Sequence, residues 1–219
     1  MKINRKISHY YVLLLLRMHS LLYRVLSRNA VRIEGGLHPK HRLTKYHDFF
    51  FENIMPGDSV LDIGCGNGQV LRKIAAIDGA RLTGVDISSS NTSAAEAHCQ
   101  PYPNIRIACS DIWDYDCESH FDVVLLSNVL EHLKNRVELL QRIVGKFCPR
   151  LVLIRVPMYE REWLVPYKRE MGVEWRLDDT HEIEYTENEI RQELADAGLE
   201  IQSISFRWGE MYIKSVPVK

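Results

Sequence analysis

The amino-acid sequence predicts an α/β fold built on a mostly parallel sheet with helices on both faces. Between residues 59 and 156, five short apolar runs alternate with segments of helical periodicity. Such alternation is typical of βαβ units, in which a crossover helix joins two parallel strands. Two further alternating runs, 199–208 and 210–218, predict an antiparallel hairpin at the carboxyl end, so we expect seven strands in all.

Composition places bounds on the class of protein. The chain has 219 residues, of which 46% are hydrophobic, which is enough for one domain with a substantial core. Lys plus Arg total 28 and Asp plus Glu total 29, and the resulting net charge of −1 argues against a nucleic-acid partner. The five cysteines show no metal-ligand spacing, so we expect reduced thiols in a cytoplasmic protein and predict no metal site.

The amino-terminal residues 1–53 are predicted to form a helical segment that caps the domain. Within them, residues 8–28 combine apolar side chains at helical spacing with three arginines, Arg17, Arg24 and Arg28. A bilayer-spanning helix needs about 20 apolar residues, and Arg17 interrupts this run. Two interpretations are open: a helix packed on the domain, which we favour, and a helix that attaches peripherally to a membrane surface.

A polar cluster in the segment 38–47 follows a Gly-Gly pair and includes a proline. On a helix, His41 and Lys45 would share one face. Either this face is simply solvated, or the segment closes over a ligand site. In the second case His41 and Tyr46 are candidate substrate contacts.

The most informative motif is a strand, a glycine turn and a helix start. The apolar run 59–63 predicts a buried strand, and three glycines follow at alternate positions, Gly64, Gly66 and Gly68. Glycine lets a backbone turn tightly and lie against a ligand, and the helix start adds N–H groups with partial positive charge. The dinucleotide fingerprint requires a glycine three residues after Gly66, but Gln69 stands there.

Asp62 sets this turn apart, because a carboxylate suits a ligand with positive charge and hydroxyl groups better than a phosphate. With this acid and the Gly-x-Gly-x-Gly spacing, the sequence resembles the class I S-adenosylmethionine-dependent methyltransferases of the small-molecule or glycan type. The resemblance implies a Rossmann-like fold with S-adenosyl-L-methionine as cofactor. It also implies that the turn holds the amino acid part of the cofactor, through Asp62, Gly64, Cys65, Gly66 and Gly68.

Two further acids stand at the ends of the second and third predicted strands. Asp86 ends the run 81–85, and Asp111 follows the run 104–109. Parallel strands place their carboxyl ends at one edge of a sheet, and ligands bind there. In the resembled family the first acid accepts the ribose hydroxyls and the second binds the adenine amino group. The resemblance therefore implies cofactor contacts by Asp86, Ile87, Asp111 and Ile112.

The fourth predicted strand, 121–126, leads into Ser-Asn-Val-Leu-Glu-His. The resemblance implies that this strand end meets the transferred methyl group and that Ser127 and Asn128 hold the cofactor through backbone carbonyls. The sequence here lacks the Asn/Asp-Pro-Pro-aromatic motif of amino-group methyltransferases. His132 has two interpretations: a general base that takes a proton from an acceptor hydroxyl, or a structural residue that braces the following helix, 133–147.

A long segment, 158–185, follows the fifth predicted strand, 151–156. We interpret it as a substrate-side insertion, because connections of this length are usually functional. Many methyltransferases of the resembled type have a His and then an aromatic residue before the next helix, and His181 and Tyr185 match that pattern. His181 is thus a second candidate base, level with His132, and Tyr185 is a candidate substrate contact.

These observations predict a methyltransferase domain over residues 54–219. The expected reaction is methyl transfer to a hydroxyl group of a polar small molecule or glycan. Two alternatives stay open: a methyltransferase that acts on a lipid-like or quinone acceptor at a membrane surface, and a non-catalytic cofactor-binding subunit of a partner. A dehydrogenase is disfavoured by Asp62 and Gln69, and it would bind NAD.

Overall fold

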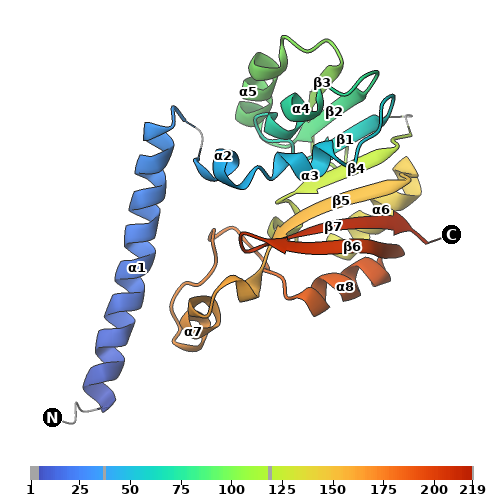
Figure 1. Cartoon of the computed structure of the whole chain (residues 1–219). Coiled ribbons are helices and arrows are strands. Elements are labelled where there is room, and N and C mark those ends of the chain that lie inside the picture. The colour runs from blue at the N-terminus through green and yellow to red at the C-terminus, as the bar shows by residue number, and fades with distance from the viewer. Residues whose placement is uncertain (1–4, 37, 118–119, 219) are drawn as a thin grey trace.

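The structure is a computed structural model that describes residues 5–36, 38–117 and 120–218. Its centre is a seven-stranded sheet in the order β3-β2-β1-β4-β5-β7-β6 (Figure 1). The pairs among β1 to β5 are parallel, and β7 pairs antiparallel with both β5 and β6. This topology confirms the predicted fold class and its carboxyl-terminal hairpin. The strands are β1 Ser59–Ile63, β2 Arg81–Asp86, β3 Ile105–Cys109, β4 Val123–Ser127, β5 Leu151–Pro157, β6 Leu199–Arg207 and β7 Glu210–Pro217.

Helices cover both faces of the sheet. Leu139, Ile143 and Phe147 recur at helical spacing along α6 and pack, with α8, into the core on one face. Phe50 of α3 and Leu71 of α4 pack into the core on the other face. The helices are α1 Arg5–Ile33, α2 Lys40–Thr44, α3 His47–Phe51, α4 Gln69–Ile74, α5 Ser89–Cys99, α6 Arg136–Phe147, α7 Leu164–Glu170 and α8 Glu187–Asp196, and the 3-10 turns are η1 Leu130–His132 and η2 Tyr159–Arg161.

The central strands are apolar along their whole length because both of their faces are covered. All seven residues of β5 are buried, and so are the first four residues of β4. Arg155 is the charged exception in β5, and its side chain is 3% exposed. A buried arginine at the carboxyl end of a central strand lies where ligands bind in such sheets.

Two segments differ from the predicted elements. The predicted helix 133–147 begins only at Arg136, because Leu133 has an extended backbone conformation. The Leu133 carbonyl accepts a 2.7 Å hydrogen bond from the Arg136 guanidinium. The residues before Leu133 form η1 instead. The predicted insertion 158–185, for which the sequence predicts no helix or strand, contains η2 and α7.

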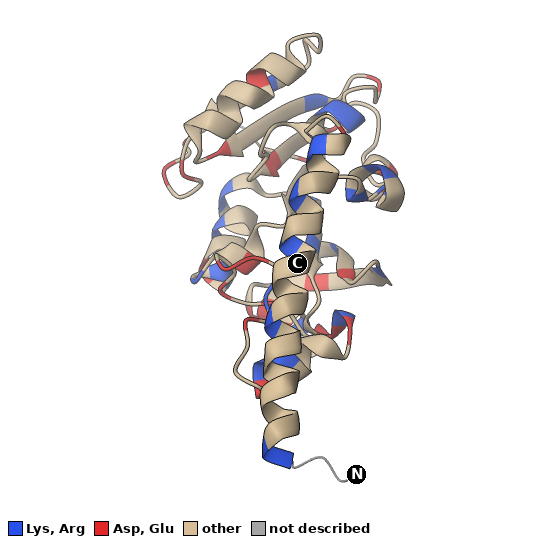
Figure 2. Cartoon of the chain, turned by 90° about the vertical axis from the view of Figure 1, so that its left-hand side faces the viewer, with Lys and Arg blue, Asp and Glu red and all other residues tan. Residues whose placement is uncertain are grey.

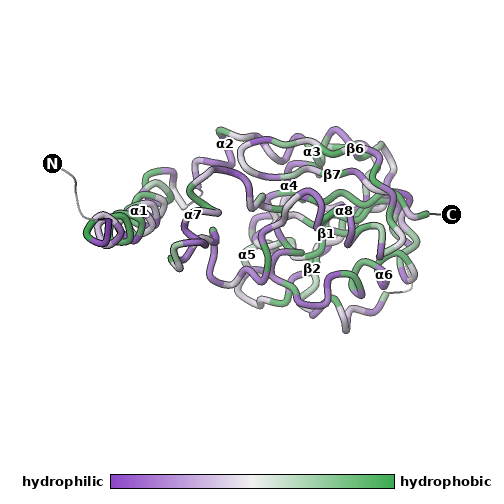
Figure 3. The backbone as a smooth tube through the Cα atoms, turned by 90° about the horizontal axis from the view of Figure 1, so that it is seen from below, coloured by the Kyte–Doolittle hydropathy of each residue, from purple (hydrophilic) through white to green (hydrophobic). Residues whose placement is uncertain are grey.

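The amino-terminal helix α1 stands beside the domain and next to α7 (Figures 1 and 3). Leu16 is the one described residue of α1 that is buried, and the polar contact of His19 with Lys168 (3.3 Å) joins α1 to α7. This arrangement differs from the packed helix that the sequence favours, because the larger apolar stripe of α1 faces away from the domain. No helix within the described residues has the length and apolarity to cross a bilayer.

Candidate functional site

A cavity of about 230 Å³ lies at the carboxyl ends of the central strands. Three parts of the chain line it: the segment around α2, the glycine turn after β1, and the ends of β4 and β5. It therefore joins three of the predicted site regions, the segment around α2, the glycine turn and the end of β4, and adds a fourth, the end of β5. The lining includes the polar side chains of Lys40, His41, Tyr46, Asp62, Asn128 and Arg155.

The glycine turn has the backbone that its spacing predicts. Gly64, Gly66 and Gly68 have φ values of +68°, +55° and +80°, a region that side-chain-bearing residues avoid. A Cβ on Gly64 would lie 2.6 Å from Cγ2 of Val129, whereas a Cβ on Gly66 would meet no atom of the described residues within 4 Å. Gly64 thus fits tightly against the loop after β4, and Gly66 borders open space at the cavity.

Asp62 presents a buried carboxylate to this cavity. The residue is 1% exposed, and its Oδ2 atom has no hydrogen-bond partner among the described residues. Burial, with a smaller contribution from the nearby charge of Asp86, raises the pKa of Asp62 to about 8. A buried acceptor of this kind is costly unless a donor or cation meets it, so the cavity suits a positively charged group.

Asp86 ties the glycine turn to the second strand. Its Oδ2 accepts a hydrogen bond from the amide of Gly66, and its Oδ1 accepts one from the amide of Ser88, each at 2.9 Å. Oδ1 also accepts a 3.3 Å hydrogen bond from the side-chain amide of Asn91, so the contacts of the described residues leave a second lone pair on Oδ2. Asp86 and the half-buried Asp111 both lie outside the cavity lining given by the described residues, at the neighbouring strand ends. The amide of Trp113 donates to Asp111 at 3.0 Å.

The other residues predicted after β2 and β3 differ in exposure. Ile87 is 71% exposed, and Ile112 packs partly against the main core. The structure thus brings Asp62 and Asp86 to one turn and leaves Asp111 and Ile112 further along the same edge of the sheet.

The segment before β1 contributes a stacked polar group that contains two predicted residues. The hydroxyl of Tyr46 lies 2.7 Å from Nδ1 of His41, and burial lowers the pKa of His41 to about 4. The guanidinium of Arg155 lies over the Tyr46 ring, 3.6 Å from its centroid. Arg155 also forms an ion pair with Glu210, with Nη2 to Oε1 at 2.7 Å. Two positive side chains, Lys40 and Arg155, therefore line the cavity, and neither belongs to the predicted site.

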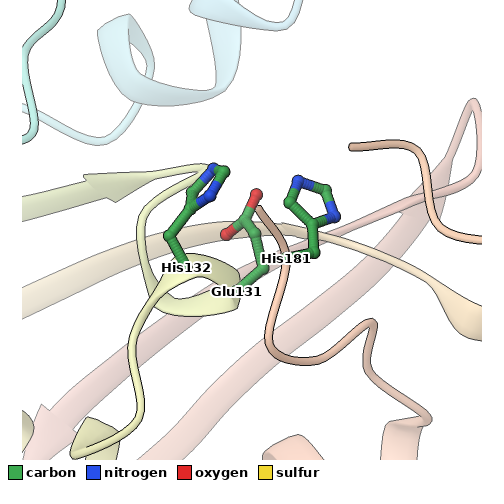
Figure 4. Close-up of side chains that lie close together, drawn as sticks. All are labelled: Glu131, His132 and His181. Carbon is green, nitrogen blue, oxygen red and sulfur yellow. The ribbon is translucent and has the colours of Figure 1, made fainter. Parts of the chain in front are cut away.

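Next to the cavity, η1 and the end of the 158–185 segment bring three side chains together. Figure 4 shows the Glu131 carboxylate between the imidazole rings of His132 and His181. The two ring centroids are 4.7 Å apart. Glu131 is fully buried, burial raises its pKa to about 7, and its Oε1 accepts a 2.7 Å hydrogen bond from the amide group of Asn128. The two histidines predicted as alternative bases thus belong to one cluster with Glu131, to which the sequence assigned no role.

The predicted substrate contact at Tyr185 does not reach this site. Its ring is fully buried in the main core, and its hydroxyl donates a 2.8 Å hydrogen bond to Glu193 of α8. This is a correction to the sequence-based expectation. Of the two residues that match the pattern of a His followed by an aromatic residue, His181 lies at the site and Tyr185 lies in the core.

Comparison with known proteins identifies relatives of this chain. A family model described as a methyltransferase domain matches residues 37–204. The chain is 32% identical over 135 residues to a ubiquinone biosynthesis O-methyltransferase of Bradyrhizobium diazoefficiens, a match that covers 59% of this chain and 53% of that protein. It is 32% identical over 96 residues to a probable cobalt-precorrin-6B C(15)-methyltransferase of Thermoplasma acidophilum, covering 42% and 48% of the two chains.

A likeness to solved structures concerns the fold. A magnesium protoporphyrin IX methyltransferase from Synechocystis, solved with bound SAH, matches with a TM-score of 0.64 and 21% identity over 79% of this chain and 82% of that chain. The chain spans about half the length of the curated relatives it matches.

Proposed function

Because this chain belongs to the methyltransferase-domain family, we propose that it transfers a methyl group to a hydroxyl oxygen of a small acceptor. Family membership confirms the resemblance carried by the glycine turn and its acids, and S-adenosylmethionine is the cofactor. The relatives carry the names of an O- and a C-methyltransferase. The choice of oxygen therefore rests on the chemistry of the site.

The observation that carries the proposal is the buried, unpartnered carboxylate oxygen of Asp62 in a cavity walled by glycine backbone. The amino acid end of the cofactor has an ammonium group that fits this acceptor. It also has a carboxylate, for which Lys40 and Arg155 bring positive charge to the cavity lining. We assign the backbone of the glycine turn to the same subsite, where it would contact the amino acid end of the cofactor. These residues are Gly64, Cys65, Gly66 and Gly68.

The adenosine end of the cofactor belongs along the neighbouring strand ends. Oδ2 of Asp86 keeps a lone pair for a ribose hydroxyl beyond the one that accepts from Gly66, whereas Oδ1 already accepts from Ser88 and Asn91. Asp111 and Ile112, with Ile87, are assigned to the adenine side. Ser127 and Asn128 line the cavity at the end where the methyl group would lie.

The cluster beside Asn128 supports oxygen as the acceptor atom. The cofactor supplies a methyl group that a positively charged sulfur already activates, so positioning provides much of the rate. A hydroxyl acceptor must also lose its proton when its oxygen bonds to the methyl carbon. His132 and His181 are the candidate groups for that proton, and Glu131 lies between them.

Helix α1 bears on the kind of acceptor. Its half-buried or buried residues, including Val12, Leu13 and Leu16, face the domain. At 100° per residue, a stripe of exposed apolar side chains lies on the opposite side. The stripe consists of Tyr11, Leu14, Leu15, Met18, Leu21, Leu22 and Val25.

Charge on α1 has one sign. Figure 2 shows only Lys and Arg along it, and its sequence contains no Asp or Glu. Arg17, Arg24 and Arg28 lie along one flank of the apolar stripe. An apolar stripe with a basic flank suits the surface of an anionic membrane. These features, with the name of the ubiquinone relative, support a lipid-like or quinone acceptor over the polar small molecule or glycan that the sequence favours.

The proposal is tested by binding and then by transfer. Calorimetric titration with S-adenosylmethionine and S-adenosylhomocysteine should give micromolar affinity, about −8 kcal/mol, and NAD should not bind. Methyl-labelled cofactor is then offered with phenolic, quinol and sugar acceptors, and labelled methyl ether is the expected product. Cofactor binding without transfer to any acceptor would favour a non-catalytic subunit, and label on nitrogen or carbon would contradict O-methylation.

A further inference from the structure

The side chains of Glu131, His132 and His181 converge on one point beside the cofactor cavity. One ligand atom from each of the three lies within 4.8 Å of the other two. They come from two separate segments, η1 and the loop before α8. Backbone hydrogen bonds from the amides of Glu182 and Ile183 to the carbonyl of Glu131 hold these segments together.

Hydrogen bonds fix the protonation of both rings. Nδ1 of His181 lies 3.1 Å from Oε1 of Glu184, and an ionised carboxylate only accepts, so Nδ1 carries a proton. Nδ1 of His132 lies 3.0 Å from the hydroxyl of Thr180, whose proton goes to Asp178 at 2.7 Å. Nδ1 of His132 therefore donates too. In its neutral form each imidazole therefore keeps its lone pair on Nε2.

Glu131 adds a third acceptor without a donor. The Glu131 side chain is fully buried, and its Oε2 has no hydrogen-bond partner among the described residues. Two imidazole rings and a buried carboxylate that lie this close together are unfavourable unless a cation joins them. His132 is exposed, so the cluster opens to solvent on that side.

We propose that Glu131, His132 and His181 bind one divalent transition-metal ion, with zinc as the best match. Two imidazoles and one carboxylate are a ligand set that suits zinc and its neighbours, whereas magnesium and calcium prefer oxygen ligands. Around tetrahedral zinc, ligand atoms lie about 3.3 Å apart, so closure takes a small shift that the exposed His132 can make. Glu184 and the Thr180–Asp178 pair are the outer partners that metal-binding histidines have.

This site deepens the proposed O-methyl transfer and rests on it for its role. The metal ion keeps a coordination position open towards the cavity, from which Asn128 reaches Glu131. An acceptor hydroxyl that binds there has a lowered pKa and releases its proton to solvent, so the two histidines then hold the metal ion instead of taking the proton themselves. Its oxygen then forms the bond to the methyl carbon as the carbon–sulfur bond breaks, and the sulfur keeps the electron pair. The metal ion does not change oxidation state.

The test measures metal binding directly on the full chain, without a polyhistidine tag and after dialysis against a chelator. Zn²⁺ is titrated in competition with a chromogenic chelator, and Co²⁺ is followed by its visible absorption. We expect one ion per chain. Glu131→Gln, His132→Ala and His181→Ala should each weaken Zn²⁺ binding by about 100-fold or more, and Thr180→Val by about 10-fold. His9→Ala, on α1, is the matched control and should bind as the wild type does.

Equal Zn²⁺ affinity in the wild type and in Glu131→Gln would overturn the site, as would the absence of binding to the wild type. Glu131→Gln keeps the shape of the side chain, and His132 is exposed. The Zn²⁺ affinities of Glu131→Gln and His132→Ala therefore test the site even if His181→Ala fails to fold. Titration with S-adenosylhomocysteine separates the two proposals. A wild type that binds Zn²⁺ but not S-adenosylhomocysteine would support the metal site and contradict the proposed function.

Discussion

The backbone carbonyl of Glu131 accepts a 2.7 Å hydrogen bond from the amide of Glu182. This bond joins the turn after β4 to the end of the long segment after β5, and it brings His181 against Glu131. The cluster of Glu131, His132 and His181, the proposed acceptor side of the site, is thus assembled by two loops that lie far apart in the sequence. Asp62 and the three glycines, in contrast, belong to one continuous segment, β1 and the turn that follows it.

Replacement of Asp62 by Asn should weaken S-adenosylhomocysteine binding by about 100-fold, because losing one partner of a buried charge pair costs on the order of 2–5 kcal/mol. Calorimetric titration at pH 8 measures this. Asp78→Asn, at an exposed aspartate, is the control and should leave the affinity unchanged. Unchanged affinity in Asp62→Asn would remove the ammonium assignment.

Asp62 also predicts how stability and cofactor affinity depend on pH. Its folded pKa of about 8 lies above the unfolded value of about 3.9, so the unfolded state ionises first. The cofactor-free protein should therefore lose stability as the pH rises from about 4 to about 8, and Asp62→Asn should lose less. Thermal unfolding of both proteins at pH 5 and pH 9 checks this.

For the same reason, S-adenosylhomocysteine should bind more tightly as the pH rises from 6 to 8, because its ammonium group needs the ionised carboxylate. The expected slope is about tenfold per pH unit below the pKa. A pH-independent affinity in the wild type would contradict the raised pKa of Asp62.

The histidines of the cluster should act as one unit. His132→Ala and His181→Ala should each lower turnover by about 10²–10⁴-fold, and the double variant should be little slower than either single one. S-adenosylhomocysteine affinity should stay near that of the wild type in all three. A loss confined to one histidine would instead assign a single general base.

The glycine turn offers a matched pair of substitutions. Gly64→Ala should mainly lower stability, because its Cβ would lie 2.6 Å from Val129 and overpacking costs about 1–3 kcal/mol. Gly66→Ala adds no such clash with described atoms and should cost about 1–2 kcal/mol of backbone strain, while it weakens cofactor binding more. Denaturant unfolding and S-adenosylhomocysteine titration separate the effects. The reverse ranking would show that Gly66 does not border the cofactor.

Helix α1 should carry membrane binding if the acceptor is lipid-like. The wild type should co-sediment with vesicles that contain phosphatidylserine, and less so at high salt. The double substitution Leu15→Asp and Leu22→Asp should abolish this, whereas Leu43→Asp, an exposed leucine on α2, should not. Equal sedimentation of all three proteins would show that α1 does not carry the membrane binding.

Sequence patterns predict the sheet well because burial on both faces leaves apolar runs that end at turns. The same reasoning finds Asp62, Asp86 and the glycines, since all of them follow strand ends. His132 and His181 can be proposed singly, but their pairing depends on how the loops fold. No local pattern reports the hydrogen bonds between Glu131 and the segment before α8.

Other features have weaker signals or none. Arg155 could have been identified as a lone charge in an otherwise apolar strand, which is unusual unless the charge is paired. The direction in which α1 faces could not, because an amphipathic stripe does not state whether it meets the domain or turns away from it. Tyr185 fits a family pattern, yet its hydroxyl bonds to Glu193 within the core.

The position of β7 between β5 and β6 governs when the cavity can form during synthesis. Arg155 in β5 forms its ion pair with Glu210, the first residue of β7, and the two residues are 55 positions apart. The Arg155 guanidinium, which stacks on Tyr46, therefore lacks its anionic partner until β7 has left the ribosome and entered the sheet. Because such late, long-range pairing is slow, the nascent chain acquires a complete ligand pocket only after most of its sheet exists.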